Sequence, residues 1–213
     1  MRGFKNAKIQ KKNRTFAKKI AMLILGIDPG TQILGYSLID TDGGKPQLVV
    51  MDVLYLKKIA DFHLRLRKIL DSTTRIIDSF HPDHLAIEAP FVGKNIQSTI
   101  KLGKAQGVAI AAAMGRDLSF TEYEPTVVKQ RVTGNGVASK EQVAMIMQQI
   151  FGFKDQPQYM DASDALAVAY TCYLETSDPL GDLRKQLKPQ RSRKSKKQQW
   201  ADFVEQNPDR VDP

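Results

Sequence analysis

This sequence of 213 residues offers neither the cysteines for a disulfide nor the apolar run for a membrane span. Its single cysteine, Cys172, excludes an internal disulfide bond and suits a reducing cytoplasm, where we expect the protein to act. No run of 18 apolar residues occurs, so we expect no transmembrane helix. The first residues carry charge without an apolar signal core, which argues against a secretion signal. The length and composition predict one cytoplasmic globular domain with its own core.

Acidic residues are absent from two strongly basic stretches. Residues 1–21 and residues 184–197 each contain eight lysines and arginines and no aspartate or glutamate. Residues 22–183 carry 15 basic against 19 acidic side chains, so the net charge of +9 resides in the two arms. We expect both arms to be disordered and to bind the phosphates of nucleic acid independently of its sequence, although a solubilising tail has the same composition. Met22 directly precedes an apolar run, so a natural start at Met22 stays open.

Hydrophobic patterning between the arms predicts an α/β domain. Strands are expected at residues 22–28, 33–40, 48–54, 84–88 and 118–123, and helices at residues 60–80, 95–114, 126–132, 139–151 and 161–174. Tight turns join the first three strands, which predicts that they are antiparallel, whereas helical crossovers make the later strands parallel. The expected fold is a mixed five-stranded sheet with helices on both faces.

Four carboxylates stand out against this pattern. Asp28 and Glu88 each end an apolar strand, while Asp161 and Asp164 lie three apart on one helix and therefore face the same way. Buried carboxylates are costly and repel one another, and divalent cations relieve that repulsion. Hard oxygen ligands in this number suit Mg2+, and a pair of such ions can drive hydrolysis of a phosphodiester.

Simpler explanations exist for single members of this set. Asp161 could be a helix N-cap, and Asp28 could serve the turn formed by Pro29 and Gly30. Glu88, at a strand end before Ala-Pro, is harder to explain in this way. The prediction of a metal site therefore depends on the four residues together.

Several segments, in order and spacing, resemble the RuvC family of Holliday-junction resolvases over about residues 23–174: IDPGTQILGYSLID, LAIEAPFVGKN, IKLGKAQGVAIAAA, VVKQRVTGNGVASKEQV and DASDALAVA. The resemblance implies a ribonuclease-H-like fold in a nuclease domain at residues 22–176, flanked by the basic extension 1–21 and the basic tail 177–213. It also implies a homodimer that makes symmetric paired nicks in four-way junction DNA during recombination and repair, with RuvA and RuvB as partners. The family's acids fall on Asp28, Glu88, Asp161 and Asp164, which implies two Mg2+ ions, with Mn2+ as a substitute.

Three further positions match the family's DNA-contacting residues. Phe91 falls in the loop after Glu88, where the family places an aromatic side chain that stacks on junction bases; Pro90 and Gly93 favour a loop over a core position. Lys129 and Lys140 match basic residues near the scissile phosphate, although each alone would be an ordinary surface lysine.

Two other functions compete with this interpretation. The IDPGT motif also resembles the first phosphate loop of actin-like kinases and ATPases, but the chain is short for their second lobe and has no later Gly-Gly phosphate loop. A non-catalytic junction-binding module is the other alternative, and the intact acid set argues against it. For the dimer, Gly103, Gly107 and Ala111 form a smooth stripe on helix 95–114 that predicts close approach, either by a second subunit or by the chain's own sheet.

Overall fold

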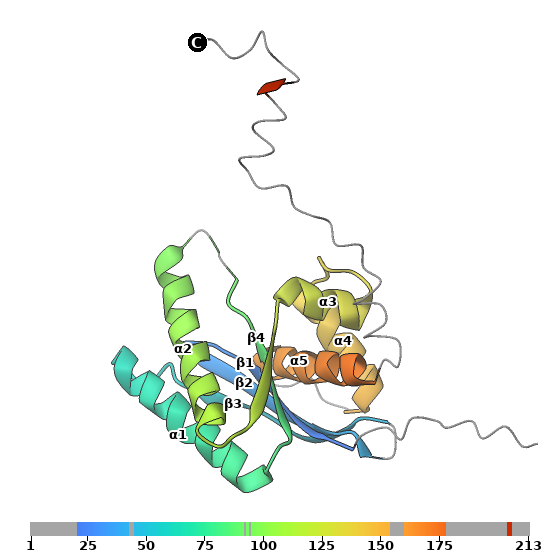
Figure 1. Cartoon of the computed structure of the whole chain (residues 1–213), viewed down its shortest axis with the longest axis horizontal. Helices are drawn as coiled ribbons and strands as arrows, with labels where there is room; N and C mark the ends of the chain where they lie inside the picture. Colours follow the sequence, from blue (N-terminus) through green and yellow to red (C-terminus); the bar gives the residue numbers. More distant parts are fainter. Residues whose placement is uncertain are drawn as a thin grey trace, which may run out of the picture. The chain divides into compact units, whose positions relative to one another are not determined.

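The computed structural model describes residues 21–42, 45–91, 93, 95–153, 160–177, 204 and 205 (Figure 1). The chain divides into two units, Met1–Asp178 and Pro179–Pro213, and of the second unit only Val204 and Glu205 are described. Nearly all of the two predicted basic arms therefore lies outside the described residues. The elements in chain order are β1 (Leu23–Asp28), β2 (Ile33–Asp40), β3 (Gln47–Tyr55), α1 (Phe62–Phe80), β4 (His84–Glu88), α2 (Ile96–Met114), β5 (Ser119–Tyr123), α3 (Pro125–Thr133), α4 (Lys140–Phe151) and α5 (Met160–Thr176).

The five strands form one mixed sheet in the order β3-β2-β1-β4-β5. Strands β1, β2 and β3 pair antiparallel, whereas β4 pairs parallel with both β1 and β5. The predicted mixed sheet and the predicted strand directions are thus confirmed. Because β1 and β4 run in the same direction, their carboxyl ends lie together at one edge of the sheet.

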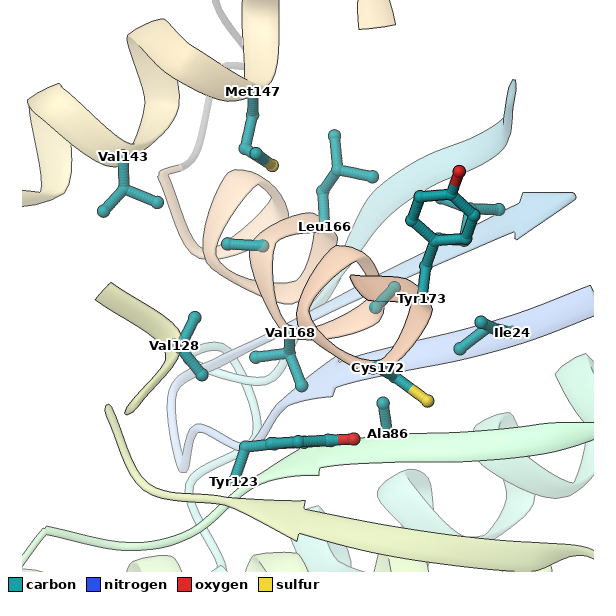
Figure 2. Close-up of a cluster of buried hydrophobic side chains, with 13 residues drawn as sticks. Ile24, Ala86, Tyr123, Val128, Val143, Met147, Leu166, Val168, Cys172 and Tyr173 are labelled. Carbon is teal, nitrogen blue, oxygen red and sulfur yellow. The ribbon is translucent and has the colours of Figure 1, made fainter. Parts of the chain in front are cut away.

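Alternating side chains of the central strands divide the core between the two faces of the sheet. Ile24 of β1 packs with α3, α4 and α5, while Leu25 and Ile27 pack with α1 and α2. Figure 1 shows α1 and α2 on one face and α3, α4 and α5 on the other. Figure 2 shows α5 at the centre of the second layer, where Leu166 and Val168 lie among side chains from the neighbouring elements. Helices on both faces were predicted, and this prediction is confirmed.

The helix ends follow local sequence signals. Asp61 caps α1 by accepting a hydrogen bond from the Leu64 backbone at 2.9 Å. Ser139 and Gln142 form the predicted capping box of α4, each side chain bonding the other residue's backbone N–H. This cap fixes where α4 begins and so places Lys140 in its first turn. None of the helices in the described ranges is long and apolar enough to cross a bilayer.

Candidate active site

Two of the predicted carboxylates lie at the shared end of β1 and β4. Ile27 and Ile87 are partners in the parallel pairing, and Asp28 and Glu88 each follow directly along their strands. Both isoleucines are fully buried, so the sheet core holds the two backbones in place. The edge of the sheet thus presents two adjacent carboxylates, as the ends of the two apolar strands predicted.

Two glycines allow α5 to lie directly on this part of the sheet. Gly35 is the register partner of Asp28, and a Cβ on Gly35 would lie 1.9 Å from the carbonyl oxygen of Asp161. A Cβ on Gly26 would lie 2.3 Å from the carbonyl oxygen of Ala165. Any larger residue at either position would push α5 away from β1 and β2. These glycines therefore bring Asp161 to Asp28, and the sequence reasoning missed them, although glycine inside an apolar strand signals a close backbone approach.

The helix α5 contributes the other two acids from its first turns. It begins at Met160, so Asp161 lies inside the helix, and the N-cap explanation for Asp161 does not apply. Asp164 follows one turn later, and its side chain is only 12% exposed. The two aspartates therefore project from the same side of the helix.

Three of the four carboxylates have raised pKa values. Burial raises the pKa of Asp28 well above its usual value, and the charges of Glu88, Asp164 and Asp161 raise it further. Burial, followed by the charge of Asp164, raises the pKa of Glu88 to about 7. Burial also raises the pKa of Asp164, against the opposing effect of Lys140. Such a group of acids is held together by the fold against its own electrostatic repulsion.

Lys140 supplies a positive charge in direct contact with this group. Its Nζ donates a hydrogen bond of 2.5 Å to Oδ2 of Asp164. Burial works against its charge, but the hydrogen bond and charge of Asp164 raise the pKa of Lys140 to about 12. Lys140 therefore stays protonated and partly neutralises the acids. The nearby Lys129 acts in the same direction, because its charge lowers the pKa of Glu88 and Asp164.

A pocket of about 520 Å3 opens beside the acids. It gathers five of the seven predicted site residues, each from a different element or loop: Glu88, Phe91, Lys129, Lys140 and Asp164. Asp28 and Asp161 do not line the pocket, but the charges of Glu88 and Asp164 raise the pKa of Asp28, and the charge of Asp161 raises the pKa of Asp164. Phe91 is 68% exposed, so it is not a core residue. Apolar walls come from Val128, Val143 and Ala167, which the sequence reasoning had not singled out.

The chemistry of this donor set fits divalent cations, because it offers four hard carboxylate oxygen donors in a buried, electrostatically unfavourable group. As the side chains stand, no three histidine, cysteine, aspartate or glutamate residues of the described ranges converge closely enough to hold one ion. The two observations are compatible. The strands and α5 place the four acids at one sheet edge, which is a property of the backbone, whereas convergence on one ion is a property of the side chains.

Comparison with known proteins matches this chain to one family over nearly all of the described domain. The family described as "Crossover junction endodeoxyribonuclease RuvC" matches residues 24–172. A protein of that description from Porphyromonas gingivalis is 47% identical over 89% of this chain and 96% of its own length. One from Bacteroides fragilis is 46% identical over 89% of this chain and 95% of its own length.

Solved structures agree with the sequence relatives. The structure of Thermus thermophilus RuvC in complex with a Holliday junction substrate is 30% identical, with a TM-score of 0.66 over 73% of this chain and 97% of that chain. The yeast mitochondrial Holliday junction resolvase Ydc2 shares the fold at 15% identity, with a TM-score of 0.54. These neighbours confirm the ribonuclease-H-like fold that the sequence resemblance implied. With the match covering residues 24–172, this chain belongs to the RuvC family of crossover junction endodeoxyribonucleases.

Proposed function

We propose that this chain is a nuclease that resolves four-way (Holliday) junctions by symmetric paired nicks in recombination and DNA repair. The observation that carries the proposal is the set of four carboxylates that β1, β4 and α5 bring to one sheet edge, beside a pocket that also holds two lysines and an exposed phenylalanine. The family membership supports it, since the Thermus thermophilus relative was solved with a Holliday junction substrate. A cytoplasmic location fits the single cysteine, which is a buried free thiol.

In this proposal Asp28, Glu88, Asp161 and Asp164 hold two Mg2+ ions, for which Mn2+ can substitute. The bound ions would supply an activated water and stabilise the departing 3′ oxygen, leaving 5′-phosphate and 3′-hydroxyl ends. The fold supports this role by keeping carboxylates together that would otherwise move apart. The raised pKa of Glu88, about 7, shows how unfavourable a further negative charge is at this edge before a cation arrives.

The two lysines and Phe91 would act on the DNA. Lys140 lies against Asp164 from the start of α4, and Lys129 lines the same pocket from α3, so both can approach a phosphate that meets the acids. Phe91 presents an apolar ring to solvent at the same pocket. An exposed aromatic side chain beside cations suits stacking on a base near the scissile phosphate. The two basic arms would add affinity that does not depend on sequence.

We also propose that the protein is a homodimer, because one active site cannot nick two strands symmetrically. The stripe predicted on helix 95–114 faces away from the sheet: a Cβ on Gly107 would meet nothing within 4 Å. Exposed apolar residues extend the stripe along one face of α2, at Ile96, Ile100, Gly107, Ala111 and Met114, and Gly103 in the same row is half-buried. The stripe therefore does not pack on the chain's own sheet, which leaves a second subunit as its proposed partner. RuvA and RuvB are the further partners that membership of the family suggests.

Junction cleavage tests the proposed function directly. Purified protein would be incubated with a labelled synthetic four-way junction and Mg2+, without ATP, beside a linear duplex of the same sequence. We expect symmetric nicks in the junction and little cleavage of the duplex. Binding without cleavage would favour the junction-binding module, and a requirement for ATP would favour the actin-like alternative.

The dimer has its own test in Gly107→Arg. Because Gly107 faces open space, the arginine fits the single subunit, and it replaces a poor helix former. We expect light scattering to show dimers for the wild type and monomers for the variant. Val49→Arg, on an exposed position of β3, is the matched control and should stay dimeric. A wild-type monomer at micromolar concentration would overturn the dimer.

A further inference from the structure

Val137 is 85% exposed, the highest value among the large apolar side chains that the structure describes. A single exposed valine is ordinary on a protein surface, but its position here is not. Val137 lies in the loop between α3 and α4 and lines the same pocket as Phe91 and the two lysines. The proposed roles of the acids, the lysines and Phe91 leave this side chain unexplained.

The loop that carries Val137 is braced from α3. The side chain of Gln130 donates to the Gly134 carbonyl at 2.7 Å and accepts from the Gly136 backbone at 3.0 Å. Asn135 accepts a hydrogen bond from the Val137 backbone through Oδ1 at 3.1 Å.

The next residues of the loop are fixed as well. Ala138 is buried, and Ser139 caps α4. With both ends of the loop anchored, Val137 has little freedom to withdraw into the protein. Its exposure is therefore built into the free protein and leaves apolar surface in water.

The surroundings of Val137 indicate what covers it. Lys129 and Lys140 bring positive charge to the pocket, while Phe91 and the buried Val128 supply apolar surface. A nucleotide has the matching pattern, since an anionic phosphate is joined to the less polar faces of a sugar and a base. An uncharged protein surface would match the valine but not the two lysines.

We propose that Val137 is a second apolar contact for junction DNA, packing against the deoxyribose and base edge of a nucleotide beside the phosphate that the lysines meet. It would act from a different loop than Phe91, so the DNA strand would be held by apolar contacts from two separate loops. The inference rests on the proposed function, because it takes the acids as the site of strand cleavage.

The test is the affinity of Val137→Thr for a labelled four-way junction, measured in Ca2+ by fluorescence anisotropy. Threonine keeps the branched shape and replaces one methyl group by a hydroxyl. We expect Kd to rise about fivefold, a fraction of what full burial of a valine provides. Because no charge changes, the rise should be the same at every salt concentration. Val137→Leu should bind like the wild type, and Val49→Thr is the matched control for an exposed valine elsewhere.

The outcomes separate this inference from the proposed function. If the wild type binds and cuts junctions and Val137→Thr binds with unchanged Kd, the second contact is wrong and the nuclease assignment stands. A weaker Kd with an altered salt slope would also overturn it, since the effect would then come from the lysines. A wild-type protein that neither binds nor cuts junctions overturns the proposed function itself. Equal melting temperatures of the variants confirm that folding is not the cause.

Discussion

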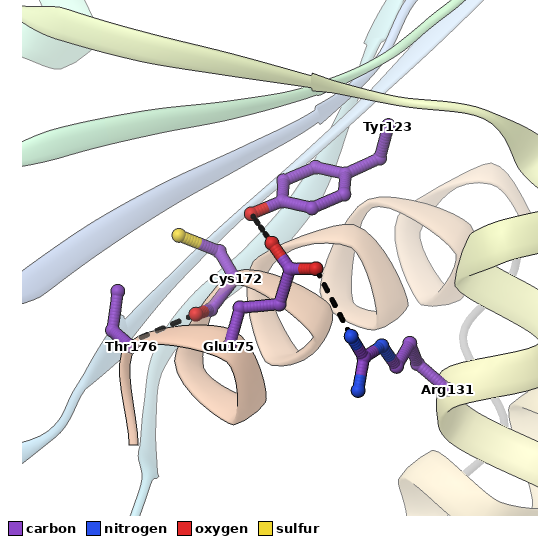
Figure 3. Close-up of polar contacts among 5 residues, drawn as sticks. All are labelled: Tyr123, Arg131, Cys172, Glu175 and Thr176. Atoms are coloured by element: carbon purple, nitrogen blue, oxygen red, sulfur yellow. Dashed lines mark hydrogen bonds and ion pairs between the residues drawn. The ribbon is translucent and has the colours of Figure 1, made fainter. Parts of the chain in front are cut away.

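At its N-terminal end α5 brings Asp161 and Asp164 to two further carboxylates, whereas at its C-terminal end Glu175 lies between two donors (Figure 3). There the hydroxyl of Tyr123 donates to Oε2 of Glu175 at 3.2 Å, and Arg131 donates to Oε1 at 3.2 Å. The N-terminal end of α5 thus gathers acids, whereas at the C-terminal end one carboxylate bonds a hydroxyl and a guanidinium. The C-terminal end secures α5 to β5 and α3, which helps the fold to tolerate the repulsion among the acids at the N-terminal end.

The largest expected effect comes from removing one charge at the acidic end. Asp28→Asn keeps the size of the side chain, and we expect junction cleavage to fall by roughly two orders of magnitude or more. The melting temperature without divalent ions should hold or rise, because repulsion among the acids is reduced. Asp71→Asn, an exposed carboxylate on α1, is the control and should cut normally. An Asp28→Asn protein that cuts at the wild-type rate would falsify the site assignment.

Phe91→Ala tests the proposed stacking contact with DNA beside the acids. Stacking on a base contributes about 1–3 kcal/mol, so junction affinity should fall by that amount. Because the ring is 68% exposed, the free energy of unfolding should barely change. Anisotropy with a labelled junction and urea unfolding of the free protein measure the two quantities. A loss of stability of about 3–5 kcal/mol, as for a core phenylalanine, would contradict the exposed position of Phe91.

Glu175→Ala tests the C-terminal end of α5. It should lower the stability of the protein, whereas Phe91→Ala should lower the affinity for the junction. The buried hydroxyl of Tyr123 loses its carboxylate acceptor and keeps only the weaker thiol of Cys172, so we expect the free energy of unfolding to fall by about 1–2 kcal/mol. The pair with Arg131 adds little, because both side chains are partly exposed to water.

Urea unfolding measures the loss of stability. The same Glu175→Ala change, made in a protein that already carries Tyr123→Phe, is the control. In that background Glu175→Ala should reduce the free energy of unfolding much less, since there is no buried hydroxyl to lose its carboxylate acceptor. Equal losses in both backgrounds would mean that Glu175 contributes in another way.

The last expected effect, similar in size to that of Glu175→Ala, is the pH dependence of stability in the presence of a chelator. Burial and the charge of Asp164 raise the pKa of Glu88 from 4.5 to about 7 in the folded protein. The folded state therefore binds more protons than the unfolded state between these values. The resulting stabilisation is fully present below about pH 4.5 and is lost as the pH rises through 7.

We expect this contribution to be on the order of 1–3 kcal/mol, and Glu88→Gln should remove most of it. Urea unfolding at a series of pH values, compared between the wild type and the variant, measures the difference. A difference that stays constant from pH 5 to pH 8 would contradict the assignment.

Much of this protein followed from local sequence. Apolar runs and turn residues predicted all five strands, their directions and the helices on both faces, because strand and helix periodicities are properties of adjacent residues. The capping box of Ser139 and Gln142 was predictable for the same reason. Asp28 and Glu88 could be chosen because a carboxylate at the end of an apolar strand is unusual wherever the strand lies, and Asp161 and Asp164 because they lie three apart on one helix.

Only the tertiary structure decided how these parts meet. The close approach of Asp161 to Gly35 joins residues far apart in sequence, and no local pattern specifies which strand a helix covers. The raised pKa of Glu88 depends on burial and on Asp164, which α5 brings to it. The outward direction of the Gly107 stripe and the exposure of Val137 likewise depend on what the rest of the chain leaves uncovered. Sequence determined the elements and the chemical groups, whereas packing decided their distances, because distances arise from the contacts of the whole fold.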